Sequence, residues 1–331
     1  MRQTFKISNW FTIITKHISY IIIIFITVFS VLQICYGKTN EEEIFVNINK
    51  VEQYLNIRYN DLNFPIILFI HGGPGSSLVN ESKSFDSLLL KNFIIINWDQ
   101  RNTGKTKIDN SNEFNLNILH KDTEEVIKFI MEKFNRKKIY LASHSWGSVL
   151  AFNYIIKHPD NISAYIGISP IIDQKKSTEL TINDLTNWAK ENNNIKALSE
   201  LSKVNIPIND KKDLYFQQKW LFIKNGLNLE DEKKFKEKYY IWMDIWFDIW
   251  LQSVKKSIFE INKNYKCPIY FIEGNYDGYK SHNLVEEYYN YLDSPSKGLY
   301  WMEFSGHTIY NTEPIKLQEI IIEILNRTYS K

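Results

Sequence analysis

The segment YLASHSWGSVLAF, residues 140–152, decides how this 331-residue chain is interpreted. A short apolar run leads into Ser143, and apolar residues recur at helical spacing after Gly147. The segment therefore predicts a buried strand, a tight turn and a helix. Its turn nearly spells G-x-S-x-G, with Ser143 in place of the first glycine. Small residues on both sides of the central Ser145 allow such a turn to close.

Ser145 has two interpretations. A turn of this kind exposes the serine Oγ, as a nucleophile requires, and the backbone N–H of Trp146 at the helix start is placed to stabilise an oxyanion. The alternative is that Ser145 only caps the helix. The strand before the turn and the helix after it favour the nucleophile.

Strands and helices alternate on both sides of this segment. Continuous apolar runs end at His71, Asp99, Ser143 and Gly274, and amphipathic stretches lie between several of them. The strands lack polar alternation, which is typical of a mainly parallel sheet with helices on both faces.

The alternation stops near Ile171 and resumes at CPIYFIEG, residues 267–274. Residues 171–264 contain no convincing strand and read as a helical, aromatic-rich insertion. We therefore expect an α/β core formed by residues 38–170 and 265–331. A helical cap of residues 171–264 is then inserted before the last two strands.

The stretch HGGPG, residues 71–75, follows an earlier strand of the predicted sheet. Its glycines allow the backbone to approach a substrate closely, and a second oxyanion donor is expected from a loop in this position. Gly73 is the first candidate for that donor, and Gly72 is the second. An ordinary Gly-Pro turn is the alternative.

A nucleophilic serine needs a base and a group that orients the base. Asp277 lies in the loop after one late strand and His307 in the loop after the next, so serine, acid and histidine follow one another in chain order. The competitors fit less well. His144 adjoins Ser145 and should point away from its Oγ, and Glu273 still lies at the strand tip. His158 and His282 fall at helix ends.

Five motifs occur in order: HGGPG, WDQRNTG, SHSWGS, GNYDG and SGH. Together they resemble the proline iminopeptidase branch of the α/β-hydrolases, over residues 43–170 and 265–331. The resemblance implies an α/β-hydrolase fold with Ser145 as nucleophile, Asp277 as acid and His307 as base, and with Gly73 and Trp146 as oxyanion donors. Asn102 and Ser143 stand where the family has glycine.

The resemblance leaves the substrate open. Proline iminopeptidases bind a free N-terminal amine with carboxylates, some of them from the cap. Asp244 and Asp248 form the polar strip of an otherwise apolar helical segment, YYIWMDIWFDIWLQ, and face either solvent or the pocket. Glu313, near His307, is a third candidate for an amine contact, and a role at a helix start is its alternative.

The N-terminus has a separate character. Residues 18–37 carry no formal charge and follow Lys16 and His17, as in a secretory signal or an uncleaved membrane anchor. We expect residues 1–37 to be a cleaved signal peptide or to anchor the chain through residues 18–36. The globular part would then be exported, to a periplasmic or extracellular location. The net charge of +2 gives no reason to expect nucleic-acid binding.

These patterns predict an exported serine hydrolase that acts through an acyl-enzyme on a short peptide or small molecule, without a metal or cofactor. An aminopeptidase of the proline iminopeptidase type is the first expectation. An esterase or amidase of small acyl substrates is the second, because the cap decides the substrate. An inactive binding module of the same fold is the third. The oligomeric state stays open.

Overall fold

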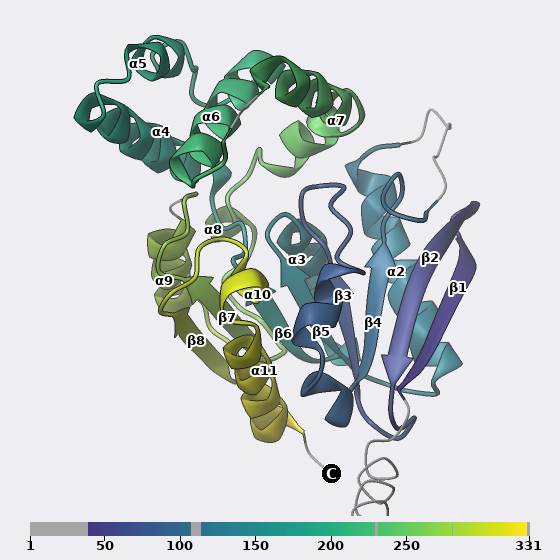
Figure 1. Ribbon diagram of the computed structural model, residues 1–331. Helices are drawn as coiled ribbons and strands as arrows, with labels where there is room; N and C mark the ends of the chain where they lie inside the picture. The colour runs from purple at the N-terminus through teal and green to yellow at the C-terminus, as the bar shows by residue number, and fades with distance from the viewer. Residues whose placement is uncertain (1–38, 107–113, 229–230, 280, 330–331) are drawn as a thin grey trace, which may run out of the picture. The chain divides into compact units, whose positions relative to one another are not determined.

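The computed structural model describes residues 39–106, 114–228, 231–279 and 281–329. They form one eight-stranded sheet in the order β1-β2-β4-β3-β5-β6-β7-β8, with helices packed on it (Figure 1). The strands are β1 (Asn40–Ile48), β2 (Val51–Tyr59), β3 (Ile66–Ile70), β4 (Ile94–Asp99), β5 (Ile139–His144), β6 (Ile162–Ile168), β7 (Ile269–Gly274) and β8 (Lys297–Met302).

Most of the sheet is parallel. Strand β3 pairs in parallel with β4 and β5, and parallel pairing continues from β5 through β6 and β7 to β8. Strand β2 pairs with β4 in the antiparallel sense. The carboxyl ends of β3 to β8 therefore meet at one edge of the sheet, where ligands of open α/β sheets bind.

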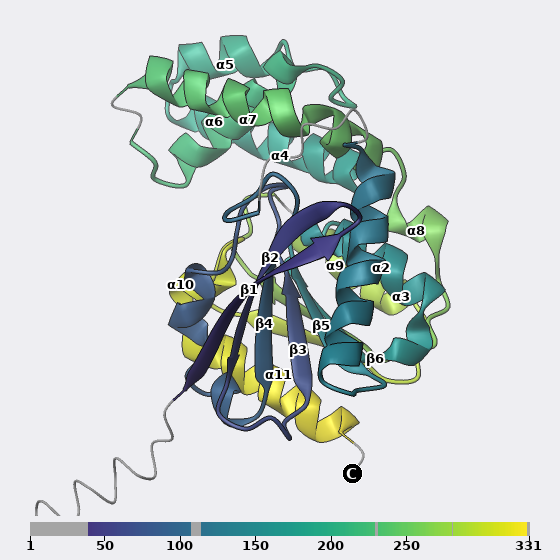
Figure 2. The same cartoon turned by 90° about the vertical axis from the view of Figure 1, so that its right-hand side faces the viewer.

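Helices cover both faces of this sheet (Figure 2). One face packs on α2 (Leu116–Lys133), α3 (Gly147–Lys157) and α9 (Ser281–Tyr291). The other face packs on the 3-10 helices η1 (Glu81–Phe85) and η2 (Leu89–Lys91), and on α10 (Ile309–Thr312) and α11 (Pro314–Thr328). A short 3-10 helix, η3 (Pro159–Asn161), follows α3. Alternate residues of strands β3 to β7 enter the two apolar cores, so these central strands are largely apolar.

Between β6 and β7 the chain contains only helices in the part that the structure describes. These are α4 (Gln174–Glu191), α5 (Ile195–Leu201), α6 (Lys211–Lys224), α7 (Glu232–Ser253) and α8 (Ile258–Ile261). Helices α4 to α7 lie over the carboxyl edge of the sheet, as Figure 1 shows. The predicted fold class, an α/β hydrolase with a helical cap before the last two strands, is confirmed.

The cap is built in two ways. Helices α4, α5 and α6 share an apolar cluster of their own, which includes Leu185, Leu201 and Trp220. Helix α7 instead sends Met243, Trp246 and other apolar side chains into the main core of the sheet domain. The cap is therefore attached to the core through α7 and, by Leu214 and Tyr215, through the start of α6.

The predicted leader, residues 1–37, lies outside the described residues. Within the part of the chain that the structure describes, no helix is both long and apolar enough to cross a membrane.

Candidate active site

Ser145 lies on a sharp turn between β5 and α3. Its φ is +52°, a left-handed conformation that non-glycine residues seldom adopt, and its N–H donates to the carbonyl of Ile168 at 3.0 Å. A side chain at Gly147 would come within 2.5 Å of the Ile70 carbonyl oxygen, so only glycine fits there. Ser143 is buried and its Oγ lies 2.8 Å from the hydroxyl of Tyr165. The turn therefore needs small residues at both flanking positions, and of these two serines only Ser145 lines the cavity at the carboxyl edge of the sheet.

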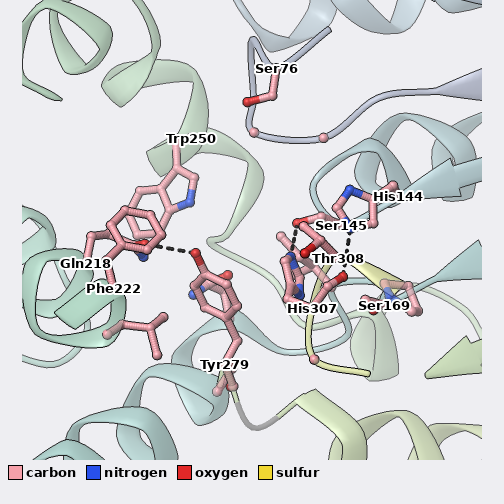
Figure 3. Close-up of a pocket in the computed structure, with 18 of the residues that line it drawn as sticks. Ser76, His144, Ser145, Ser169, Gln218, Phe222, Trp250, Tyr279, His307 and Thr308 are labelled. Atoms are coloured by element: carbon pink, nitrogen blue, oxygen red, sulfur yellow. Dashed lines mark hydrogen bonds between the residues drawn. The ribbon is translucent and has the colours of Figure 1, made fainter. Parts of the chain in front are cut away.

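His307 and Asp277 complete a chain of hydrogen bonds with this serine (Figure 3). His307 lies in the loop after β8, and its Nε2 is 2.8 Å from Ser145 Oγ. Its Nδ1 is 2.8 Å from Oδ2 of Asp277, which lies in the loop after β7. An ionised Asp277 can only accept a hydrogen bond, so Nδ1 carries the proton and Nε2 is left to accept from the serine hydroxyl.

Asp277 is held in its ionised form. Burial of this fully enclosed carboxyl raises its pKa, but the charge and hydrogen bond of His307 and the N–H of Tyr279 together lower the pKa below its ordinary value. The Tyr279 N–H donates to Oδ1 at 2.8 Å. The carboxylate is therefore charged throughout the pH range in which the protein would work.

His144 supports the loop of the base. Its Nε2–H donates to the backbone oxygen of His307 at 2.9 Å, and the two rings lie 5.1 Å apart. Burial, followed by the nearby charge of His307, lowers the pKa of His144 to about 3. A neutral His144 therefore fixes the position of His307 without competing for the proton of Ser145.

The HGGPG loop lies against the serine turn. A side chain at Gly72 would come within 2.9 Å of Ser145 Cβ and 3.3 Å of the Trp146 nitrogen. Gly73 has a φ of +110° and lines the cavity with Gly72. Trp146 precedes the first residue of α3, where backbone N–H groups have no acceptor within the helix. The two predicted oxyanion donors thus belong to segments that touch beside Ser145.

His71 holds this loop in place. Its Nδ1–H donates to the Gly72 oxygen at 3.0 Å, and its Nε2 accepts from the Gln100 N–H at 3.2 Å. Burial lowers the pKa of His71 to about 4, so the ring is neutral, as both bonds require. Gln100 also donates from its side chain to the His71 carbonyl at 3.0 Å. The DQR motif therefore positions the glycine loop. Asn102 takes the left-handed conformation, with a φ of +56°, at the position where the family has glycine.

These groups open into a cavity of about 740 Å³ at the carboxyl edge of the sheet. Its core wall comes from strand-end loops and contains Gly72, Gly73, Ser145, Ser169 and His307. Its cap wall comes from α6 and α7 and contains Leu214, Gln218, Leu221, Phe222, Asn225, Tyr239, Trp242 and Trp250.

The predicted amine contacts do not lie at this cavity. Asp244 and Asp248 are exposed on α7, and Asp244 pairs with Lys211 at 2.6 Å. Because Trp246 and its apolar neighbours take the inward face of α7, the acidic strip is left in solvent. Glu313 lies at the start of α11 but accepts from the Phe304 N–H at 2.9 Å and from Ser305 Oγ, so it fixes the loop before His307. The expectation that these three carboxylates bind the substrate is therefore wrong, because none of them lines the cavity.

Other residues take their place in the cavity. Glu81 and Asp173 are the carboxylates that line it in the described part of the chain. Tyr279, also unanticipated, packs on His307 with ring centroids 4.5 Å apart and donates its hydroxyl to Gln218 at 2.8 Å. The position of Tyr279, two residues after Asp277, was the one available signal for it. No sequence motif marked Glu81 or the residues of α6 as part of the site.

Curated proteins of similar sequence agree with this architecture. The chain is 26% identical over 291 residues to a protein named probable aminopeptidase YbaC of Bacillus subtilis (strain 168), covering 81% of this chain and 91% of that one. It is 26% identical over 279 residues to the proline iminopeptidase of Heyndrickxia coagulans, covering 78% and 90% respectively.

Solved structures share the fold. A proline iminopeptidase-related protein from Thermus thermophilus superposes with a TM-score of 0.62 at 18% identity, over 87% of this chain and 98% of that one. The proline iminopeptidase of Mycobacterium smegmatis gives 0.63 at 11% identity, over 87% and 98%. The family described as the alpha/beta hydrolase fold matches residues 65–291. This chain therefore belongs to the alpha/beta hydrolase family, and within it is similar to proline iminopeptidases.

Proposed function

We propose that this protein is a serine aminopeptidase that releases the first residue of a short peptide through an acyl-enzyme. The observation that carries the proposal is the hydrogen-bond chain from Asp277 through His307 to Ser145, which lines a cavity of about 740 Å³. Relatives named as an aminopeptidase and as a proline iminopeptidase support it.

The reaction follows from the geometry. Ser145 Oγ attacks the carbonyl carbon of the scissile amide while its proton passes to Nε2 of His307. The N–H groups of Trp146 and of Gly73, with Gly72 as the alternative donor, stabilise the negative oxygen. His307 then protonates the departing amine. A water molecule, deprotonated by the same nitrogen, hydrolyses the ester on Ser145 and restores the free serine.

The free amine of such a substrate needs a negative partner. Glu81 and Asp173 line the same cavity as Ser145. One oxygen of Asp173 accepts the N–H of Lys176 at 2.9 Å, which fixes that side chain at the start of α4. A fixed carboxylate pairs with an ammonium group at a smaller entropic cost than a mobile one.

The test uses the full-length chain in mild detergent with aminoacyl 4-nitroanilides, and Ser145→Ala as the inactive variant. We expect turnover by the natural chain and a loss on the order of 10⁴-fold or more in the variant. Ser143→Ala is the matched control and should retain activity within a few-fold. Labelling by a fluorophosphonate should occur and should disappear in Ser145→Ala. No labelling would favour a binding module without catalysis.

One observation favours a second function, hydrolysis of esters or amides of apolar acyl groups. Residues of α6 and α7 on the cap wall include no carboxylate in the described part of the chain, so an uncharged acyl group fits there as well as an amino acid. N-acetylation of the substrate separates the two functions. An aminopeptidase should lose activity on an acetylated substrate, whereas an esterase-like site should hydrolyse it at a similar rate.

We also propose that residues 1–37 direct export or anchor the protein in a membrane. The uncharged run from Ile18 to Gly37 after a basic leader supports this. Cell fractionation with an antibody against the C-terminus tests it. Recovery in the cytosolic fraction at full length would contradict it.

A further inference from the structure

The cap wall of the cavity is an apolar recess opposite the serine. Six of its side chains, which we call the cap recess, are Leu214, Leu221, Phe222, Tyr239, Trp242 and Trp250. Figure 3 shows Phe222 and Trp250 on the far side of the cavity from Ser145 and His307. The recess therefore lies across the cavity from the serine, within the space open to a substrate bound at Ser145.

The recess is held rigidly. The Nε1–H of Trp242 donates to the carbonyl of Pro74 in the glycine loop at 2.8 Å. Tyr239 packs on Trp242 at a centroid distance of 5.3 Å, and Trp250 stacks on Phe247 at 6.2 Å. Burial of its hydroxyl raises the pKa of Tyr239 well above its ordinary value, so this group stays uncharged. Rigid, preformed aromatic walls bind apolar groups with little loss of conformational entropy.

The polar groups on the cap side are few. Gln218 already accepts the hydroxyl of Tyr279 at 2.8 Å, and Asn225 lies at the end of α6. The cavity lining includes no lysine or arginine in the described part of the chain, so an acidic side chain entering the recess would lose its water without gaining a partner of opposite charge. The recess therefore disfavours acidic side chains.

The cavity is large for a small occupant. Its volume of about 740 Å³ is that of a pocket for a drug-sized ligand. A prolyl group would leave most of the recess unfilled, and apolar surface left in contact with water contributes nothing to binding. A larger side chain would bury more of the recess and gain more binding free energy.

We infer that the cavity selects substrates whose first residue carries a large apolar or aromatic side chain, such as leucine or phenylalanine, over proline. The inference rests on the proposed function, because it takes Ser145 as the nucleophile. Leu221 and Phe222 on α6 are its specificity-determining residues, since they line the recess beside Gln218.

The experiment measures kcat/KM of the full-length chain for the 4-nitroanilides of phenylalanine, leucine, alanine, proline and aspartate. We expect phenylalanine and leucine to exceed proline by about tenfold or more, and aspartate to be the poorest. A preference for proline would overturn this inference and leave the aminopeptidase function standing. No turnover of any substrate, together with no fluorophosphonate labelling, would overturn both.

Two variants locate the selectivity. Leu221→Trp fills the recess and should lower kcat/KM for phenylalanine by about 10- to 100-fold while alanine and proline are retained. Leu227→Trp, the same substitution at an exposed position just after α6, is its control. Because Leu221 is also buried in the cap, Phe222→Ala is the milder second variant.

Phe222→Ala should raise KM for phenylalanine about tenfold and leave alanine nearly unchanged. An equal loss on every substrate in both variants would contradict a role in specificity, because it would indicate general damage to the cap.

Discussion

The two walls of the cavity are built on different principles. The core wall consists of short loops at strand ends, in which glycine, serine and histidine are fixed by backbone geometry and by hydrogen bonds of 2.8 to 3.2 Å. The cap wall consists of side chains from α6 and α7 that meet by apolar packing. The core wall holds most of the groups that can make or break a bond. The cap wall holds groups that contact the substrate without reacting with it.

This difference separates chemistry from selectivity. A catalytic group must be placed within a few tenths of an ångström, so its surroundings tolerate little change. An apolar wall tolerates volume-conserving substitutions at a cost below about 1.5 kcal/mol. We therefore expect substitutions in the core wall to abolish turnover and substitutions in the cap wall to redirect it.

The largest effect expected is from Asp277→Asn. The amide leaves His307 in the wrong tautomer for accepting the proton of Ser145, so kcat should fall on the order of 10⁴-fold with little change in the fold. Steady-state kinetics with an aminoacyl 4-nitroanilide measure this, and circular dichroism checks the fold. Asp173→Asn is the control on the cap side and should act mainly on KM. A kcat for Asp277→Asn within tenfold of that of the natural chain would contradict the catalytic role assigned to the core wall.

The next effect concerns pH and the glycine loop. The pKa of His71 is about 4 in the folded protein, below the ordinary value of 6.5 for a histidine in water, so between these values the unfolded chain binds a proton that the folded protein excludes. The contribution of His71 to the free energy of unfolding should therefore reach its maximum above pH 6.5. It should fall by about 3 kcal/mol as the pH drops towards 4.

Urea denaturation at several pH values tests this for the natural chain and for His71→Gln. The variant should be less stable at pH 7, because it loses the bonds to Gly72 and Gln100, but its stability should depend less steeply on pH. Equal slopes in the two proteins would show that other groups, such as His144, cause the acid sensitivity.

A smaller effect is expected from Gly147→Ala in the serine turn. The added methyl group would come within 2.5 Å of the Ile70 oxygen and 2.7 Å of the His71 oxygen, and backbone atoms cannot move aside easily. We expect a loss of about 2 kcal/mol in the free energy of unfolding, with reduced kcat. Gly167→Ala, whose nearest obstacles are side chains at 3.0 Å or more, is the matched variant and should lose less. Equal losses of stability in the two variants would mean that the serine turn does not require glycine at position 147 more than the sheet requires it at position 167.

The smallest effect is expected from Trp242→Phe on the cap wall. The ring is retained, but the hydrogen bond to Pro74 is lost, which should cost about 1 kcal/mol of stability and change KM more than kcat. Trp188→Phe, at a cap tryptophan that packs on Trp220 instead of lining the cavity, is the control. A large fall in kcat for Trp242→Phe would show that the cap takes part in the chemistry.

The same contrast explains what the sequence allowed us to predict. The central strands β3 to β7 are largely apolar runs, and Ser145, Asp277 and His307 each lie in the loop after a strand. The fold and the meeting of these three side chains were therefore predictable from chain order. Their catalytic roles stay predictions until the kinetics are measured. Asp244 and Asp248 were misplaced because the direction of a helix face depends on what packs against it. For the same reason no local pattern marked Tyr279 or the residues of α6.

Two residues of the cap wall, Trp250 and Leu221, differ in how freely they can change during evolution. Trp250 of α7 is shared between the cavity and the main apolar core, and its neighbour Trp246 lies directly against Gly75 of the glycine loop. Leu221 of α6 belongs to the separate cluster of the cap. Descendants of this enzyme that acquire new substrates should therefore carry their changes at Leu221 more readily than at Trp250, because a change at Trp250 would also weaken the domain on which all activity depends.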